Sequence, residues 1–180
     1  ALAALDKAVA ELRSNRPQAA VALLRDASRS WADHPGIYFY YALALHKNRD
    51  PNEAAKYYRA VLEQYPDHVP TLNNLAVLEV TRRQILVGVP LILRAVRLAP
   101  DVVSVNDNAY RMLLRLEDMK FRGLESEVAQ LRMANYRFES AMRSQGLARW
   151  GTAWLATDQV SQNEAKNQEI EAQLNALTAK

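Results

Sequence analysis

Residues 35–66 read PGIYFYYALALHKNRDPNEAAKYYRAVLEQYP, and residues 69–100, offset by 34 positions, read VPTLNNLAVLEVTRRQILVGVPLILRAVRLAP. The two stretches align without a gap, and a third copy precedes them. The following residues share repeat positions: Ala8, Ala42 and Ala76; Ala20, Ala54 and Gly88; Leu24, Tyr58 and Ile92; Ala27, Val61 and Ala95; Asp33, Asp67 and Asp101. A period of this length is typical of helix–turn–helix units, which bury their apolar faces only by stacking.

Each unit contains the signals for two helices and a turn. In the second unit, Asp50-Pro51-Asn52-Glu53 combines a capping aspartate, a proline in the first helical turn and a glutamate three residues after the cap. Pro66 then ends the helix. The units are predicted at about residues 1–34, 35–68 and 69–102, with a capping helix at 103–117. Tyr110 stands there in place of the repeated alanine, so we expect the repeat to end.

The composition favours an all-α, soluble chain. Hydrophobic residues make up 49% and charged residues 24%, both ordinary for a globular protein, and only 5 glycines interrupt many helix-forming residues. We therefore expect essentially no sheet. The absence of cysteine excludes disulfides and a cysteine-based zinc site. The compartment stays open, with the cytoplasm favoured slightly over the periplasm.

The charge and hydropathy patterns argue against two kinds of partner. The net charge of +3 is spread over mixed signs, whereas nucleic-acid binders usually concentrate positive charge, so no nucleic-acid partner is expected. RNA binding by helical repeats remains a third class of function. The longest apolar run, 85–93, is too short to span a bilayer, so no membrane insertion is expected.

That apolar run also predicts a second interface. It is apolar on every side, and a helix without a polar face is usually covered on both sides. The residues expected to contribute are Ile85, Val87, Leu91 and Leu93. Pro90 is expected to kink the helix or delay its start.

Residues 118–180 depart from the repeat and predict a helical extension. A long helix is expected from about Leu124 to Ser144. The stretch 149–157, with Trp150 and Trp154, predicts a tight turn or a small hairpin anchored by tryptophan. The last helix, starting at Thr157 or Ser161, carries a weak heptad seam of Val160, Asn163, Asn167, Ile170, Leu174 and Leu177. It either folds back on the 85–93 surface or pairs between chains.

The small, aromatic and proline positions resemble the tetratricopeptide repeat. The match covers residues 1–117 and is closest over 35–102. Within 1–34, Lys7 and Ala32 depart from the family pattern. The resemblance implies a right-handed α-α superhelix of helical hairpins, whose first helices line a concave groove for a peptide or helix of a partner.

Mapped by the period, the resemblance implies a set of groove residues. They are Phe39, Leu43, His46, Lys47, Asn73, Asn74, Val77, Arg111 and Arg115, with Thr81, Asp107 and Asn108 at further groove positions. Asn74 resembles the family asparagine that bonds the backbone of an extended ligand. Arg13, Lys47, Arg111 and Arg115 predict a cationic ladder for an acidic partner. Alternatively, the cations at the ends of first helices only offset the helix dipole.

No catalytic, metal or cofactor site can be assembled from the sequence. It offers no nucleophile–base pair and no glycine-rich phosphate loop. His34 and His68 are one period apart, too far to share a metal ion. We therefore expect neither enzymatic activity nor a cofactor. The predicted function is a protein–protein interaction scaffold, and the alternative is an oligomerisation module in which the C-terminal helices pair and the repeats are a platform.

Overall fold

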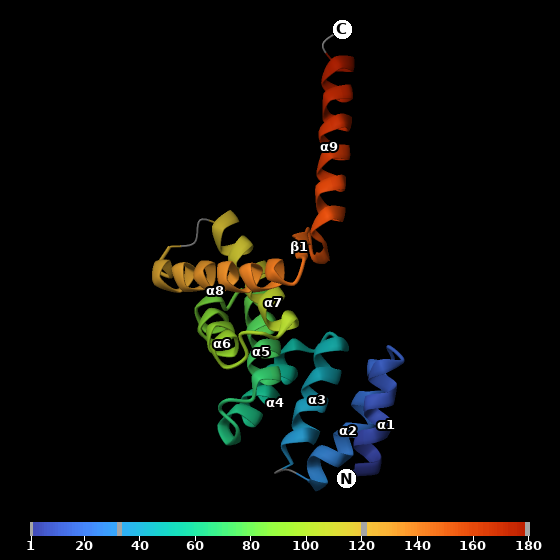
Figure 1. The fold of residues 1–180 in the computed structure, drawn as a ribbon. Helices are drawn as coiled ribbons and strands as arrows, with labels where there is room; N and C mark the ends of the chain where they lie inside the picture. Colours follow the sequence, from blue (N-terminus) through green and yellow to red (C-terminus); the bar gives the residue numbers. More distant parts are fainter. Residues whose placement is uncertain (1, 32–33, 120–121, 179–180) are drawn as a thin grey trace. The chain divides into compact units, whose positions relative to one another are not determined.

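The computed structural model describes residues 2–31, 34–119 and 122–178, so Ala32 and Asp33 lie outside the described residues. The chain is built almost entirely of helices, as predicted (Figure 1). The elements are α1 (Leu2–Arg13), α2 (Pro17–Ser30), α3 (Pro35–Lys47), α4 (Pro51–Gln64), α5 (Val69–Thr81), α6 (Ile85–Leu98), α7 (Val103–Asp118), α8 (Glu125–Ser144), β1 (Leu147–Trp150), β2 (Ala153–Ala156) and α9 (Thr157–Thr178).

The chain divides into two compact units. Unit 1 comprises Ala1–Leu131 and unit 2 comprises Arg132–Lys180, so the boundary lies inside α8. Unit 1 therefore contains the whole of the predicted array 1–117 and continues beyond it.

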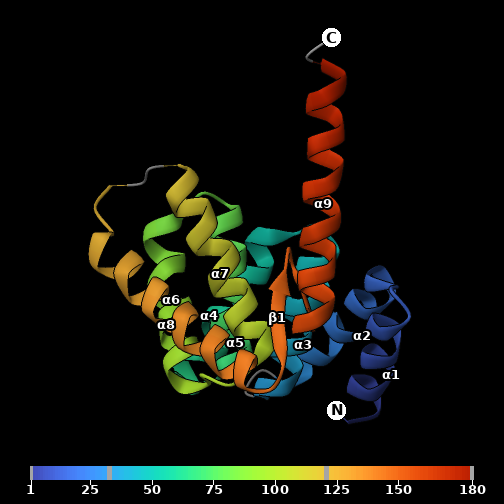
Figure 2. The same ribbon diagram turned by 45° about the horizontal axis from the view of Figure 1, so that its top comes forward.

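The 34-residue period of the sequence is also the period of the structure. The helices α3, α5 and α7 begin at Pro35, Val69 and Val103, and α2, α4 and α6 begin at Pro17, Pro51 and Ile85. Tandem helical hairpins, α1–α2, α3–α4 and α5–α6, follow one another in unit 1 (Figures 1 and 2). The predicted cap is present, since the Asp50 carboxylate accepts a hydrogen bond from the amide of Glu53 at 3.3 Å.

Each turn inside a hairpin has the same backbone shape. The residue after the C-cap of the first helix has a positive φ in all three hairpins: Asn15 (54°), Arg49 (63°) and Arg83 (64°). The following amide then reaches back to the last turn of the helix, as in the bond of 2.9 Å from the Asp50 amide to the Leu45 carbonyl. This geometry is the Schellman motif, in which glycine is the usual residue at the left-handed position.

Small residues mark where the helices cross. Ala8, Ala42 and Ala76 are fully buried on the first helices, and Ala20 and Ala54 are fully buried on the second helices. Helix axes approach within about 8 Å only where a crossing side chain is small. These alanines therefore set the spacing within the stack. Gly88 occupies the third crossing position of the second helices and is also buried.

The contacts between helices give unit 1 its curvature. The first helices touch their successors, α1 with α3, α3 with α5 and α5 with α7. Among the described residues, the second helices α2, α4 and α6 make no comparable sets of contacts with one another. Since the first helices lie closer together than the second helices, they form the inner side of the stack.

Pro90 lies inside α6 and does not have one of the two effects predicted for it. The helix begins at Ile85 and runs without interruption through Pro90 to Leu98, so the proline does not delay its start. Proline at this depth lacks the amide that would bond one turn back. Pro90 is exposed, and so is Leu86, whose carbonyl would otherwise accept that bond.

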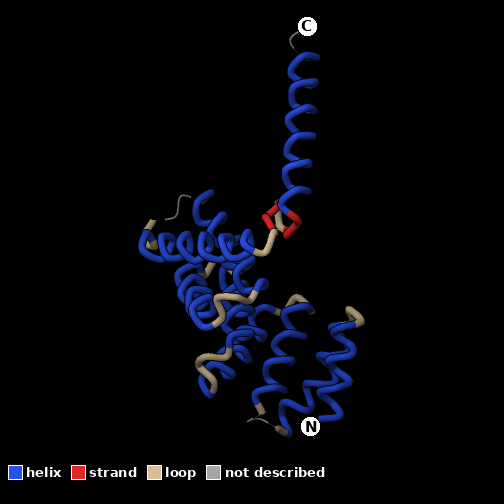
Figure 3. The backbone as a smooth tube through the Cα atoms, viewed as in Figure 1, coloured by secondary structure: helices blue, strands red, loops and turns tan. Residues whose placement is uncertain are grey.

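Unit 2 consists of the C-terminal part of α8, a hairpin and α9. The strands β1 and β2 pair antiparallel, with Trp150 opposite Ala153, and form a small hairpin, one of the two structures predicted for this segment (Figure 3). Gly151 opens the two-residue loop with a φ of 60°, which glycine adopts readily. The last helix begins at Thr157, the earlier of the two predicted starts.

The hairpin is fixed to α8 by one tryptophan and one arginine. The rings of Trp154 and Phe138 meet edge to face at 5.5 Å. The Arg149 guanidinium lies 4.4 Å from the centre of the Trp154 ring and donates to the Glu139 carboxylate at 3.2 Å. Trp154 thus has the anchoring role predicted for the tryptophans of this segment.

Candidate partner-binding groove

The predicted groove residues lie on three first helices of unit 1. Phe39, Leu43, His46 and Lys47 belong to α3, Asn73, Asn74 and Val77 to α5, and Arg111 and Arg115 to α7. The three cations are exposed, Asn73 is buried and the others are half-buried. Because the first helices form the inner side of the stack, this set provides a partly apolar, partly basic surface.

A row of hydrogen-bonded amides joins these helices. The Asn108 amide on α7 donates to the Asn73 carbonyl oxygen at 3.0 Å, and the Asn73 amide donates to Asn74 at 3.2 Å. The Asn74 amide then donates to the Tyr58 hydroxyl on α4 at 3.4 Å. Each amide uses one of its two N–H groups in this row. The row therefore orients the three amide side chains.

Aromatic rings continue from the Tyr58 end of this row. The Phe39 ring lies 6.1 Å from the Tyr58 ring and 5.3 Å from the His68 ring, measured between centroids. The His46 ring lies 6.5 Å from Tyr58. Tyr58 is fully buried, whereas Phe39 and both histidines keep part of their surface. The sequence pointed to Tyr58 only as a core residue and did not indicate that its hydroxyl would end the amide row.

Burial in this cluster favours neutral side chains. It lowers the pKa of His46, and the neighbouring Lys47 lowers it further. Burial also lowers the pKa of His68 and raises the pKa of the Tyr58 phenol. Near neutral pH the aromatic part of the surface is therefore uncharged, and the positive charge comes from the lysine and arginine side chains.

The lowered histidine pKa values predict a loss of stability in acid. Below a pH of about 6.5, His46 and His68 bind protons in the unfolded chain more readily than in the folded chain. The free energy of unfolding therefore decreases as the pH is lowered. Urea unfolding at about pH 7.5 and about pH 5.5 measures this loss. We expect it to be smaller in the variant H46Q/H68Q than in the unmodified chain. An equal loss in both proteins would contradict the assignment.

The repeated histidines also have a structural role. His34 is the N-cap of α3, and its Nδ1 accepts a hydrogen bond from the Ile37 amide at 3.4 Å. His68 is the N-cap of α5, and its Nδ1 lies 2.7 Å from the Thr71 hydroxyl. Their spacing of one period therefore follows from the two helix starts. Within the described ranges, no group of three histidine, cysteine, aspartate or glutamate side chains could hold a metal ion.

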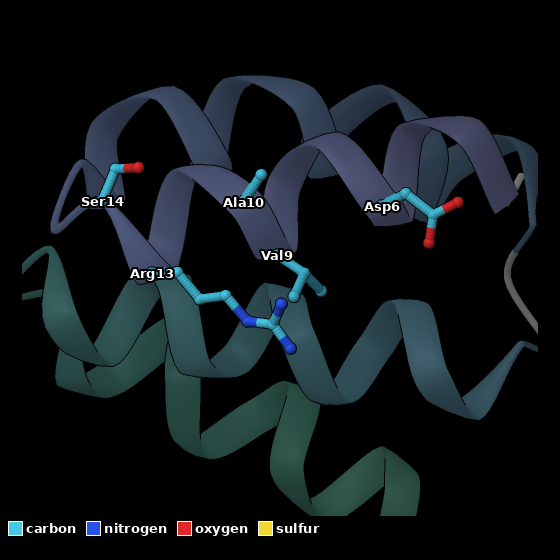
Figure 4. Close-up of a pocket in the computed structure, with 5 residues that line it drawn as sticks. All are labelled: Asp6, Val9, Ala10, Arg13 and Ser14. Atoms are coloured by element: carbon cyan, nitrogen blue, oxygen red, sulfur yellow. The ribbon is translucent and has the colours of Figure 1, made fainter.

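The helix α1 carries residues equivalent by the repeat period to groove residues of α3. A depression there is lined by Asp6, Val9, Ala10, Arg13 and Ser14. Val9 and Arg13 precede Leu43 and Lys47 by one period, and Figure 4 shows them pointing to the same side of the helix. Asp6 places one negative charge beside this surface. Arg13, like Lys47 and Arg115, is exposed.

The predicted second interface is only partly accessible. Ile85 and Leu93 are buried, Leu91 is half-buried and Val87 is exposed. Leu86 is more exposed than Val87, although the sequence pattern did not single it out. The exposed large apolar side chains of α6 therefore lie at its two ends, Leu86 and Val87 in the first turn and Leu98 in the last turn. No helix among the described residues has both the length and the hydropathy needed to cross a bilayer.

These features define unit 1 as a stack of helical hairpins with an amide-rich and aromatic inner surface. The family model of the tetratricopeptide repeat matches residues 5–69. The predicted resemblance to the tetratricopeptide repeat is therefore confirmed over these residues. Proteins with such repeats are in general protein-interaction scaffolds.

The fold is also similar to solved structures of MamA. A structure of MamA AMB-1 in the P212121 form has a TM-score of 0.64 and 16% identity, over 77% of this chain and 73% of that chain. MamA AMB-1 in the C2221 form has a TM-score of 0.60 and 15% identity, over 81% of this chain and 88% of that chain. MamA MSR-1 has a TM-score of 0.59 and 14% identity, over 79% and 87%. At this identity the likeness confirms the superhelical fold alone. No curated protein matches the sequence.

Proposed function

We propose that unit 1 is a non-enzymatic scaffold that holds an extended segment of a partner protein against α3, α5 and α7. The observation that carries the proposal is the amide row from Asn108 through Asn73 to Asn74, which ends on the Tyr58 hydroxyl. Asparagine both donates and accepts hydrogen bonds, as a peptide backbone does. A pre-oriented row of such groups suits an extended backbone and carries little ordering cost on binding.

The neighbouring side chains indicate what the segment contains. Phe39 lies beside the row, is half-buried and is held by rings on two sides, so it can receive an apolar side chain. Lys47, Arg111 and Arg115 are exposed cations at predicted groove positions. Complementary charge increases the rate of encounter and the discrimination between partners. We therefore propose a segment with an apolar residue flanked by acidic residues.

The proposal is tested with peptides selected from a random display library on the full chain. The variant F39A/N74A should bind the selected peptides at least about tenfold more weakly, since an aromatic contact and a polar contact are both lost. The matched control is Q64A/Y65A, which removes an exposed amide and an exposed aromatic ring at the end of α4. Calorimetry gives the affinities, and circular dichroism verifies that all proteins are equally helical.

The affinities of the two variants show whether the peptides bind at the groove or at another surface. Unchanged affinity in F39A/N74A would contradict the proposal, as would an equal loss in the control variant. Raising the salt concentration should weaken binding if the exposed cations contact acidic residues, because salt screens exposed charges.

A further inference from the structure

Within the described residues of unit 2, the long helix α9 is buried at its beginning and exposed further along. It has 22 residues, and its contacts within unit 2 are with β1 and β2. Val160 in the first turn is buried, whereas every residue over 164–175 is exposed. In proteins, most of the stability of a helix comes from the packing of one of its faces rather than from the propensities of its residues. Packing of its outer part would therefore stabilise it.

The exposed part carries a heptad seam. Counting Val160 as position a, the later a positions are Asn167 and Leu174, and the d positions are Asn163 and Ile170. Ile170 and Leu174 are 53% and 56% exposed, although both are large apolar residues. The next seam residue is Leu177, whose side chain lies outside the described residues. The spacing places these residues on one stripe of the helix.

We propose that α9 pairs with α9 of a second copy of this chain as a parallel, in-register, two-stranded coiled coil. Asparagine at position a favours two strands in register, because the two amides can bond each other only when they are level. Asn167 occupies such a position. The helix that packs on the seam is therefore α9 of an identical chain, because that helix has the same asparagine at the same position along the coiled coil.

The charges beside the seam favour the parallel orientation. Lys166 is at position g and Glu171 is at the following position e. In a parallel pair, a g side chain faces the next e side chain of the partner helix, so each lysine meets a glutamate. In an antiparallel pair, e positions face e positions and bring together the acidic residues Glu164 and Glu171. Exposed ion pairs contribute little energy, but they select the orientation.

The pairing is weak because two of the five seam positions with described side chains are asparagine. The full chain should therefore be monomeric when dilute and dimeric when concentrated. The variant I170D places a charge in the seam and should remain monomeric throughout. The matched control A172D places the same charge two residues away at position f, on the outer side of the helix, and should dimerise like the unmodified chain. Sedimentation velocity over about 5–500 µM covers the range expected for a weak complex.

An engineered disulfide between the two α9 helices tests whether they are parallel. The chain has no cysteine of its own, so an introduced cysteine can pair only with its copy in the other chain. Under mild oxidation, N163C should yield a covalent dimer, because equivalent d positions adjoin in a parallel pair. The control A165C, at position f, should not. A monomeric unmodified chain at every concentration would overturn the proposal. Equal cross-linking of both cysteine variants would also overturn it. So would a lower melting temperature of I170D at the dilution at which the unmodified chain is also monomeric, because it would show that α9 covers a surface of its own chain.

Discussion

Replacing both Arg59 and Arg82 with methionine is expected to destabilise the chain by about 3–5 kcal/mol. The two guanidinium groups bind one carboxylate, Glu79, which is completely buried. Arg82 donates to Glu79 at 3.0 Å and to Asn52 at 2.9 Å, which ties α5 to α4. The double variant leaves the carboxylate buried without a cation, and a buried charge is strongly unfavourable unless it is paired.

A further substitution at Glu79 tests whether the unpaired carboxylate causes this loss of stability. The residues one period before and after Glu79 are Leu45 and Leu113, and both are buried. Adding E79L to R59M/R82M should restore most of the stability, because well-packed apolar residues often replace a buried ion pair without loss. Urea unfolding followed by circular dichroism measures all three proteins. If the triple variant is no more stable than the double variant, the cost does not come from the unpaired carboxylate.

An alanine at Gly88 is expected to cost about 1–3 kcal/mol through overpacking. A Cβ at this position would lie 2.6 Å from Val80 Cγ2 and 2.8 Å from the carbonyl oxygen of Ala76. The backbone oxygen cannot move without displacing α5, so the pair α5–α6 must separate. Alanine gains up to about 1 kcal/mol over glycine in a helix, and this gain offsets only part of the cost.

Gly36 provides the matched control, because it is also a glycine in a first turn of a helix. A Cβ there would meet the His34 side chain at 3.2 Å and the Leu5 side chain at 3.7 Å. Both neighbours are side-chain atoms, which can shift. The variant G36A should therefore change the melting temperature little or raise it, whereas G88A should lower it by several degrees. Equal melting temperatures would show that the crossing tolerates a larger residue.

The elements of unit 1 could be predicted because they depend on local signals. The period of 34 residues, the proline and aspartate at helix starts, and the small residues at crossings all lie within one unit of sequence. The turns were harder to predict, because Asn15, Arg49 and Arg83 occupy left-handed positions where a glycine would have been the signal. The conformation there is determined by the Schellman hydrogen bonds rather than by the residue type.

Features that join distant residues could not be predicted in this way. Glu79 is separated by 20 positions from Arg59, so the sequence pattern did not indicate that these two residues would form an ion pair. The amide row could be predicted only from the distance in space between Asn73 and Asn108, which are 35 positions apart in the sequence. Asn73 and Asn74 were predicted as contacts from the family resemblance, and that role remains a proposal. Likewise, the spacing within α6 did not show that Ile85 and Leu93 would be buried while Leu86 is exposed.

We propose that the inner side of the stack, at α3, α5 and α7, is the surface that binds a partner. The most direct test is an amide NMR titration of the full chain with a peptide selected on it. The claim predicts that the shifted signals cluster on α3, α5 and α7 around Phe39, Asn74 and Arg111. Shifts confined to α2, α4 and α6, or to unit 2, would contradict it.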